Sequence, residues 1–333
     1  MEMKITNLKE VSIFGMPRIA FGKKNFQIHD YEVTNDKLVL TVFENRQSKA
    51  SLFMVNADEE FITSKRIPGT PIGTYKDCAN DLHLITYYRP YKINLDSDKI
   101  SINPTKPDAV NRLIKPCAAI GPSGKYYYYY YGPARLSVEY IVINPYDNKE
   151  NTFRQIKDTL QLLLYKDNPD FVKTQYLETR GSMADIDIGD LREKVRYNKN
   201  KEEKTIHYNP IYAPLMIYED QVLIFNHIQD KIEIYNSNGI LIKNIPITYH
   251  KKEEWQNILY QDTKTQKVYT HFKYEWYSEI TEIDLETGKL KAPFKITFRN
   301  IQKIQINNEY IYFLYSDIEK GMPSKCLYQQ KLY

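Results

Sequence analysis

Short runs of apolar, aromatic and β-branched residues recur along the chain, and polar stretches separate them. Val, Ile, Tyr, Phe and Thr dominate the runs, and these residues favour strands because they pack well on a pleated surface. The pattern therefore predicts an all-β protein. The six most regular runs are "LVLTVF" from Leu38, "LHLITYY" from Leu82, "YYYYYY" from Tyr126, "VLIFNH" from Val222, "VYTHFKY" from Val268 and "YIYFLY" from Tyr310.

Each of these runs is followed by a second strand-like run, such as "SLFMVN" after the first, "EYIVIN" after the third and "KCLYQQ" after the last. In five of the six cases another turn-like stretch comes next, for example "SNG" or "ETGK", and a further run follows, as in "ILIKNIPI". Strands joined by such short turns pair with their sequence neighbours. The order predicts a repeated antiparallel meander.

The spacing of the runs indicates the repeat. The first three runs start 44 residues apart, and the last three start 46 and 42 residues apart. A four-stranded unit of about 40–45 residues has the size of a propeller blade. The third and fourth runs start 96 residues apart, close to two periods, so we expect a degenerate blade within 152–209. We predict a β-propeller of four-stranded antiparallel blades, with seven blades favoured, or six if 152–209 is an insertion.

Six consecutive tyrosines, Tyr126–Tyr131, fit this architecture. Successive strand residues point to opposite faces, so Tyr126, Tyr128 and Tyr130 should share one face. A blade lies between two neighbouring blades, and both faces of its inner strands are buried. Aromatic rings provide a large buried area, while their hydroxyls reach water or a backbone carbonyl. We favour this structural role, and the alternative is a stacking surface for sugars or bases on Tyr126, Tyr128 and Tyr130.

The two ends of the chain suggest how the ring closes. The last repeat stops one strand short, and the segment 1–14 is left over before the first full repeat. Pairing of this segment with the last repeat would remove an exposed sheet edge. We therefore expect residues 1–333 to form a single propeller domain with 1–14 as its closing strand.

The segment "IYNSNGILIKNI" has the strand, turn and strand layout that recurs in bacterial β-propeller proteins. In layout the chain resembles the NHL, YWTD and TolB-like groups. The YWTD tetrapeptide, WD dipeptides and the kelch double glycine are absent, so the resemblance is to a broad group. It implies a propeller fold over nearly the whole chain, and no catalytic residue carries over from it.

Charge and composition exclude several classes of protein. The chain has 46 basic and 42 acidic residues, interspersed along its length, which does not favour a nucleic-acid partner. The three cysteines, Cys78, Cys117 and Cys326, are far apart and form no CxxC pair, so we expect reduced thiols and no metal site. No two histidines have HxH or HxxxH spacing, and no motif indicates a cofactor.

The N-terminal stretch "MEMKITNLKEVSIF" lacks the apolar core of a signal peptide, and nowhere do 18 apolar residues run together. These features predict a cytoplasmic protein without a membrane span. If a leader precedes the chain in the cell, the cell envelope or periplasm is the expected location. The sequence carries no signal for an oligomeric state.

The segment "MADIDIGD" holds three closely spaced carboxylates, Asp185, Asp187 and Asp190, inside the irregular unit. The spacing does not match an EF-hand loop, so a solvated loop is favoured. These aspartates are nevertheless candidate binding residues, because a repeat protein that departs from its pattern often does so at a functional site.

The absence of motifs for a nucleophile, metal or cofactor favours a tyrosine-rich binding propeller that holds a protein, peptide or glycan. The alternative is a carbohydrate-active hydrolase or lyase whose site lies at the central channel, where residues from several blades converge without any sequence spacing. A cluster of ionisable groups with shifted pKa values at the channel would favour the enzyme. A neutral aromatic rim would favour the binding protein, since the fold alone does not decide.

Overall fold

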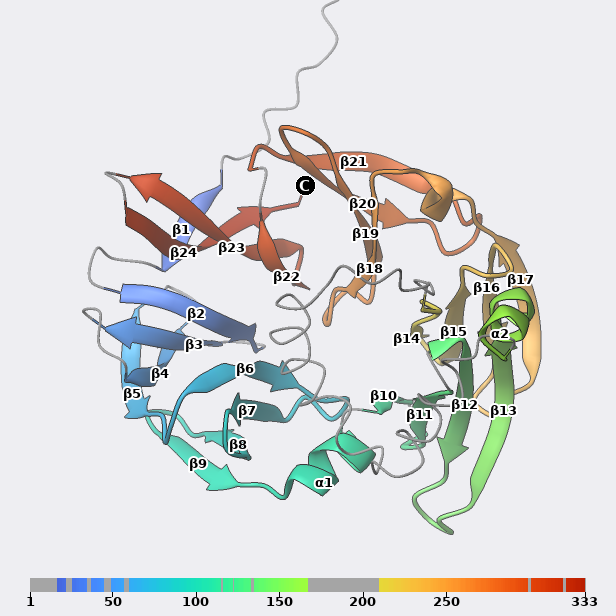
Figure 1. The fold of residues 1–333 in the computed structure, drawn as a ribbon, viewed down its shortest axis with the longest axis horizontal. Coiled ribbons are helices and arrows are strands. Elements are labelled where there is room, and N and C mark those ends of the chain that lie inside the picture. Colours follow the sequence, from blue (N-terminus) through green and yellow to red (C-terminus); the bar gives the residue numbers. More distant parts are fainter. Residues whose placement is uncertain are drawn as a thin grey trace, which may run out of the picture.

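Six four-stranded antiparallel sheets are arranged around a central axis in the computed structural model of the protein (Figure 1). This arrangement confirms the all-β class and the propeller architecture. The first strand of each blade lies closest to the axis, and the last lies on the rim (Figure 1). The structure describes residues 17–21, 26–34, 37–44, 49–56, 60–114, 116–121, 123–132, 135–166, 210–298, 301–319 and 322–332.

The first three blades follow the chain in simple order. Blade 1 consists of β2 (Phe26–Val33), β3 (Lys37–Glu44), β4 (Ala50–Asn56) and β5 (Phe61–Arg66). Blade 2 consists of β6 (Pro71–Lys76), β7 (Leu82–Thr86), β8 (Pro90–Leu95) and β9 (Ile100–Pro104). Blade 3 consists of β10 (Cys117–Ile120), β11 (Tyr126–Tyr131), β12 (Ser137–Ile143) and β13 (Glu150–Lys157).

The second half repeats the pattern, with one change in the last blade. Blade 4 consists of β14 (Leu215–Tyr218), β15 (Gln221–Asn226), β16 (Lys231–Tyr235) and β17 (Leu241–Pro246). Blade 5 consists of β18 (Trp255–Gln261), β19 (Val268–Lys273), β20 (Ser278–Ile283) and β21 (Leu290–Ile296). Blade 6 consists of β22 (Gln302–Asn307), β23 (Tyr310–Glu319), β24 (Met322–Lys331) and β1 (Arg18–Phe21).

Helical segments are short and connect the sheets. A helical turn, α1 (Pro107–Ala109), continues into the π-helical turn η1 (Val110–Ile114) before blade 3. The helix α2 (Thr159–Lys166) follows blade 3, and the 3-10 turn η3 (Tyr249–Lys251) joins blades 4 and 5. None of the helices in the described ranges is both long and apolar enough to cross a membrane.

The favoured count of seven blades is wrong, because blade 3 packs directly against blade 4. Residues 152–157 belong to β13, and α2 follows at Thr159, while 167–209 lie outside the described residues. The hydroxyl of Tyr140 on β12 donates to the carbonyl of Ala213 ahead of β14. A Cβ on Gly239 of blade 4 would lie 2.7 Å from the Cβ of Phe153 on β13. These contacts leave no space for a further blade, so the six-blade alternative describes the ring.

The N-terminal region completes blade 6. Arg18 and Ile19 of β1 are paired with Gln329 and Tyr328 of β24 in an antiparallel ladder, so the two ends of the chain close the ring. Arg18 also donates a side-chain hydrogen bond to Gln329 at 2.9 Å. The strand in this place is therefore Arg18–Phe21, whereas the segment 1–14, for which we predicted this role, lies outside the described residues.

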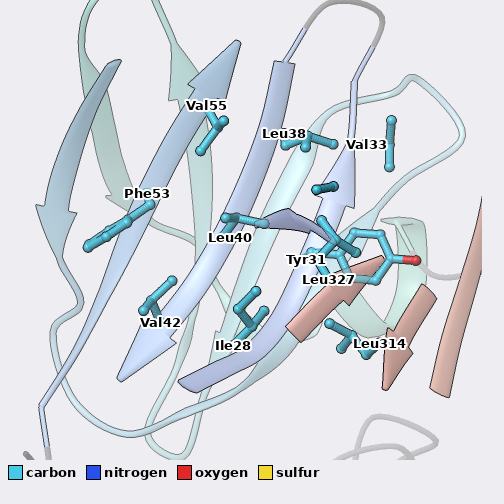
Figure 2. Packing of buried hydrophobic residues seen from close by; sticks show 11 residues of the cluster. Ile28, Tyr31, Val33, Leu38, Leu40, Val42, Phe53, Val55, Leu314 and Leu327 are labelled. Carbon is cyan, nitrogen blue, oxygen red and sulfur yellow. The ribbon is translucent and has the colours of Figure 1, made fainter. Parts of the chain in front are cut away.

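The hydrophobic core lies between the blades and is divided among them. Figure 2 shows the cluster that joins blade 1 to blade 6. Leu40 of β3 and Leu327 of β24 are both fully buried in it, and Tyr31 of β2 lies with its ring among them. Full burial of one such aliphatic side chain stabilises the fold by about 1.5–3 kcal/mol. Similar clusters join blade 1 to blade 2, blade 3 to blade 4, blade 4 to blade 5 and blade 5 to blade 6. These neighbouring blades thus depend on apolar contacts that neither blade could form alone.

The tyrosines of β11 use both faces of the strand, as the alternation predicts. Tyr127 is 1% exposed and packs with residues of blade 4. On the opposite face, the rings of Tyr128 and Tyr130 are stacked with centroids 6.3 Å apart and an interplanar angle of 7°. The run is accordingly part of the packing between blades, although its members differ in how deeply they are buried.

The expectation of three reduced thiols is wrong. Cys78 and Cys117 form a disulfide with a Cα–Cα distance of 5.7 Å, and Cys326 is free and buried. The partners are 39 residues apart in the sequence and come together because the turn after β6 meets the start of β10. The disulfide therefore joins blade 2 to blade 3.

Candidate binding pocket beside the central axis

A pocket of about 300 Å³ opens between blades 2, 3 and 4. The strand β10 is short, and its ladder with β11 covers Tyr126–Tyr128, with one further hydrogen bond of 3.0 Å from the Tyr129 N–H to the Pro116 carbonyl. The pocket lies beside the second half of β11, where Tyr129 and Tyr131 line it. The pocket is lined by Tyr75, Lys76, Asp77 and Cys78 of blade 2, by Cys117, Ala118, Tyr129 and Tyr131 of blade 3, and by residues 212–215.

Tyrosine rings form much of the pocket wall. Tyr129 and Tyr131 are adjacent on one face of β11, with ring centroids 5.5 Å apart and an interplanar angle of 73°. The Arg135 guanidinium carbon lies 5.4 Å from the centre of the Tyr131 ring. Burial, together with nearby Tyr129, raises the pKa of Tyr131 to about 12, although Arg135 opposes the rise. At neutral pH the Tyr131 hydroxyl is therefore uncharged and able to donate a hydrogen bond.

Tyr212 faces these rings from the segment ahead of β14, and its position is fixed by blades 4 and 5. Its hydroxyl accepts a hydrogen bond of 2.7 Å from the backbone N–H of Leu259. Its ring stacks on the imidazole of His227 with centroids 5.4 Å apart and an interplanar angle of 20°. Burial raises the pKa of Tyr212 well above its usual value. The ring is thus held in place before any ligand enters.

A cluster of aromatic and imidazole rings supports Tyr212 from behind. His227 lies in the turn between β15 and β16, where its Nδ1 is 2.7 Å from the carbonyl oxygen of Tyr212 and its Nε2 is 2.9 Å from the hydroxyl of Tyr249. His250 and Trp255 pack against the same imidazole. Burial lowers the pKa of His227 to about 4, so the ring is neutral at physiological pH. We interpret this cluster as a structural support.

Among the described residues that line the pocket, Lys76 is the one with a cationic side chain. Its ammonium donates a hydrogen bond of 3.2 Å to the carbonyl of Val33 in blade 1. Burial lowers the pKa of Lys76, the Glu32 carboxylate opposes this, and the positive charge of Lys303 adds to the lowering. The side chain therefore connects the pocket to the polar network at the centre of the ring.

Asp77 is the one carboxylate in the pocket lining among the described residues, and its oxygens are already engaged. Oδ2 lies 2.8 Å from Nε2 of His83, and Oδ1 accepts hydrogen bonds of 2.9 Å from the backbone N–H groups of Ala79 and Asp81. This is the pattern of an aspartate that holds a turn together. It leaves Asp77 poorly placed to act as a general base.

A second polar cluster joins blades 6, 1 and 2 along their innermost strands. The Lys303 ammonium lies 2.7 Å from a carboxylate oxygen of Asp30 and 2.7 Å from one of Glu32. Asp30 also accepts hydrogen bonds from the backbone and hydroxyl of Thr74, and Gln305 donates to Glu32 at 2.8 Å. The carboxylates are therefore paired within the protein, and the network ties three blades together.

The pocket does not use the tyrosines that the sequence suggested as binding residues. Tyr126, Tyr128 and Tyr130 do not line the pocket, which instead uses Tyr129 and Tyr131 from the other face of the same strand. Asp185, Asp187 and Asp190 lie outside the described residues. Within the part of the chain that the structure describes, no group of three or more His, Cys, Asp or Glu side chains could hold a metal ion.

Sequence reasoning missed Tyr75, Tyr129, Tyr131, Tyr212 and Lys76. The alternation of residues along β11 places Tyr129 and Tyr131 on one face of the strand. It does not predict which of the two faces lines a pocket. For Tyr75, Tyr212 and Lys76 the sequence offers no signal, because blades 2 and 4 bring them to the pocket from distant positions.

Comparison with known proteins does not assign the chain to a family. No protein family matches it, and no curated protein does. Among solved structures it is similar to a luciferin-regenerating enzyme, with 10% identity, 95% of each chain covered and a TM-score of 0.43. A calcium-binding regucalcin from Agrobacterium tumefaciens has 8% identity, 96% coverage of each chain and a TM-score of 0.41. A virginiamycin B lyase from Staphylococcus aureus has 9% identity, a TM-score of 0.38 and coverage of 96% of this chain and 99% of its own. No activity or ligand of these proteins transfers to this chain.

Proposed function

We propose that the protein is a binding propeller that holds a small ring-shaped ligand, such as one sugar unit of a glycan, in the pocket between blades 2, 3 and 4. The observation that carries this proposal is the tyrosine-lined opening beside the second half of β11. Its volume of about 300 Å³ is at the lower end of small-molecule sites. The pocket therefore suits one ring of a larger glycan better than an extended peptide.

The chemistry of the lining supports a sugar ring. The rings of Tyr129, Tyr131 and Tyr212 offer apolar surface to the C–H side of a sugar, and the neutral Tyr131 hydroxyl offers a hydrogen bond to its polar edge. Because Tyr212 is already held by Leu259 and His227, a ligand would lose little affinity to ordering of this wall.

A carbohydrate-active hydrolase or lyase is the alternative function. Its support is the lowered pKa of Lys76, since a lysine with this property can serve as a base. A glycosidase normally uses two carboxylates about 5–10 Å apart. The pocket lining contains Asp77 alone among the described residues, and Asp77 is engaged in its turn. These features favour binding over catalysis.

The test is calorimetric titration with neutral mono- and disaccharides, comparing the parent protein with Tyr131→Ala. Loss of one stacking ring should weaken binding about tenfold. Tyr131→Phe should retain most of the affinity because it keeps the ring. Tyr146→Ala is the matched control, since Tyr146 is 89% exposed on the turn between β12 and β13.

The same titration separates the two functions. After prolonged incubation, mass spectrometry should recover the saccharide unchanged if the protein is a binding protein. Conversion that is lost in Lys76→Met would establish the enzyme instead. Equal affinity of the parent protein and Tyr131→Ala, with both folded, would reject this pocket as the site.

The disulfide bears on the cellular compartment. Disulfides persist in oxidising compartments and are rare in the cytoplasm of most organisms. The Cys78–Cys117 link therefore supports a location in the cell envelope or periplasm over the cytoplasm. Alkylation of free thiols in intact cells, followed by mass spectrometry of these two cysteines, tests this location.

A further inference from the structure

A groove of about 600 Å³ lies between blades 1 and 2 near the rim of the ring, away from the pocket described above. Lys49 precedes β4, Lys65 and Arg66 end β5, and Ile102 lies on β9, the rim strand of blade 2. The link of residues 67–70 forms the rest of the lining. The groove and the pocket share no lining residue, so they are separate sites.

The groove carries positive charge that no described acidic residue neutralises. Lys49, Lys65 and Arg66 are all exposed. Over the described ranges, no aspartate or glutamate lines the groove, and no ion pair engages any of these three side chains. Exposed cations gathered without a carboxylate attract anionic groups by charge complementarity.

The floor of the groove is rigid. Ile67 is 5% exposed, and its backbone N–H donates a hydrogen bond of 3.0 Å to the carbonyl of Ala50. Arg66 and Lys65 are paired with Ser51 and Leu52 in the β4–β5 ladder. The backbone that carries the cations is therefore fixed, although the long side chains are free to adapt to a ligand.

An exposed pair of aromatic rings borders the groove. Tyr88, in the turn between β7 and β8, is 78% exposed, and its neighbour Tyr87 is 51% exposed. The backbone N–H of Tyr87 donates a hydrogen bond of 3.0 Å to the carbonyl of Thr70 in the groove lining. A Cβ on Gly69, which has a φ of +99°, would lie 3.4 Å from the Tyr88 ring. The Tyr88 ring is thus in contact with the groove wall.

We propose that this groove binds an anionic saccharide, with Lys49, Lys65 and Arg66 holding its carboxylate or sulfate groups and the Tyr88 ring stacking on a neighbouring sugar. The combination of unpaired cations and an exposed ring matches a ligand that alternates charged groups with apolar ring faces. The volume of about 600 Å³ accommodates more than one sugar unit.

The geometry of the two tyrosines argues against a single-stranded nucleic acid. Successive bases stack on aromatic rings through parallel faces. The rings of Tyr87 and Tyr88 are instead nearly perpendicular, with centroids 5.3 Å apart and an interplanar angle of 85°. The pair therefore does not present two parallel faces on which successive bases could stack.

The experiment titrates the full chain with tetragalacturonic acid, which carries carboxylates, and with a heparin-derived tetrasaccharide, which carries sulfates. Maltotetraose is the neutral control, and a short oligothymidylate is the nucleic-acid probe. The test variants are Lys65→Ala/Arg66→Ala and Tyr88→Ala. The matched control is Lys157→Ala/Lys243→Ala, which removes two exposed cations from the rims of blades 3 and 4. All four positions in the two double variants and Tyr88 are exposed, so we expect every variant to fold.

The proposal expects one of the acidic tetrasaccharides to bind more tightly than maltotetraose, with an affinity that falls as salt screens the exposed charges. The Lys65→Ala/Arg66→Ala variant should lose at least about tenfold in affinity, and Tyr88→Ala about tenfold, while the control variant is unchanged. The preferred acid identifies carboxylate or sulfate as the recognised group.

Three results would overturn the proposal. The first is that neither acidic tetrasaccharide binds the parent protein. The second is that the Lys65→Ala/Arg66→Ala variant binds them as tightly as the parent protein does. The third is tighter binding of the oligothymidylate than of both acids. None of these results depends on the pocket beside the central axis, so its own test stands independently.

Discussion

Arg154 and Glu233 form a bidentate ion pair across the boundary between blade 3 and blade 4. The Arg154 Nε and Nη2 groups donate to the two carboxylate oxygens of Glu233, each at 2.7 Å. The Glu233 side chain is 1% exposed, and it also accepts hydrogen bonds from Tyr235 and Asn226. Two parallel hydrogen bonds fix the relative position of both groups. Together with the contacts of Tyr140 and Phe153, this pair fixes how blade 3 meets blade 4.

Removal of the arginine should be costly. In Arg154→Met the apolar stem of the side chain is kept, but the buried carboxylate of Glu233 loses its bidentate partner and keeps only the Lys231 ammonium, 3.1 Å away, as a cation. We expect the free energy of unfolding to fall by about 3 kcal/mol, as for other broken buried pairs. Urea denaturation at neutral pH measures the change.

An exposed pair supplies the control for this experiment. Lys149 and Asp147 are 3.6 Å apart, and the Lys149 side chain is 83% exposed. Lys149→Met should change the free energy of unfolding by less than about 0.5 kcal/mol. If the two variants lose the same stability, the Arg154–Glu233 pair has no special role in joining the blades.

The same carboxylate makes the fold sensitive to acid. Burial alone would raise the pKa of Glu233, but hydrogen bonds from Arg154, Tyr235 and Asn226 outweigh it and hold the pKa at about 2. The usual value is 4.5. Because the folded pKa is the lower one, the stabilisation is complete above pH 4.5 and is lost as the pH falls towards 2.

Denaturation curves of the parent protein and Glu233→Gln at several acidic pH values measure this dependence. The difference in free energy of unfolding between the two should shrink as the pH falls through this window, because the glutamine does not titrate. A constant difference over the whole window would contradict the role given to Glu233.

The six runs that the sequence pattern singled out became the second strands of the six blades. For example, the run from Leu38 lies in β3 and the run from Tyr310 in β23. These strands were predictable because both of their faces pack against other blades, which demands continuous apolar or aromatic residues. The run that followed each of them became the third strand, although several of these strands also carry polar residues, such as Glu233 of β16 and Gln329 of β24.

The innermost strands and the pocket were not predictable in this way. The strand β6, "PIGTYK", mixes polar residues with apolar ones because it borders the axis. The shortness of β10, which lies beside the pocket, is not visible in residue alternation. The prediction of seven blades was wrong because it assigned a blade to 152–209 from the spacing of the runs alone. In the structure, Phe153 of blade 3 and Gly239 of blade 4 are in direct contact. The disulfide joins the turn after β6 to the start of β10, and the proximity of these two places depends on the ring itself.

A buried histidine in blade 5 should make the fold sensitive to mild acid. His271 on β19 is 7% exposed, and its Nε2 has no hydrogen-bond partner among the described residues. Burial, assisted by the positive charge of Lys273, lowers its pKa from 6.5 to about 4. The unfolded chain therefore binds a proton that the folded chain rejects, so stability falls as the pH drops from 6.5 to about 4.

The variant His271→Leu removes this proton linkage. It should reduce the pH dependence of the free energy of unfolding in that window without abolishing it, because His227, whose pKa burial also lowers to about 4, remains. Stability at pH 7 should be unchanged or higher, because a buried polar atom disappears. The control is Ile280→Val, which lies opposite His271 in the β19–β20 ladder and carries no titratable group. It should shift the whole curve by about 0.5–1.5 kcal/mol without a change of slope. An unchanged slope in His271→Leu would show that the histidine does not titrate as stated.

The disulfide should stabilise the attachment of blade 3 to blade 2. The short β10 gives blade 3 the fewest innermost ladder contacts, and Cys117 lies at the start of this strand. The link to Cys78 closes a loop of sequence separation 39, which typically stabilises a fold by about 2–4 kcal/mol. The double variant Cys78→Ala/Cys117→Ala should lose this amount in urea denaturation, and a dithiol reductant should destabilise the parent protein but not the variant.

Thiol counting under denaturing conditions provides an independent check. Without reductant, alkylation should modify Cys326 alone, and after reduction it should modify all three cysteines. Both disulfide cysteines also line the pocket, so the double variant should bind saccharide more weakly if blade 3 moves relative to blade 2. Three modified cysteines without reductant, or a double variant as stable as the parent protein, would mean that the inter-blade contacts of Tyr140 and Arg154 hold blade 3 without the disulfide.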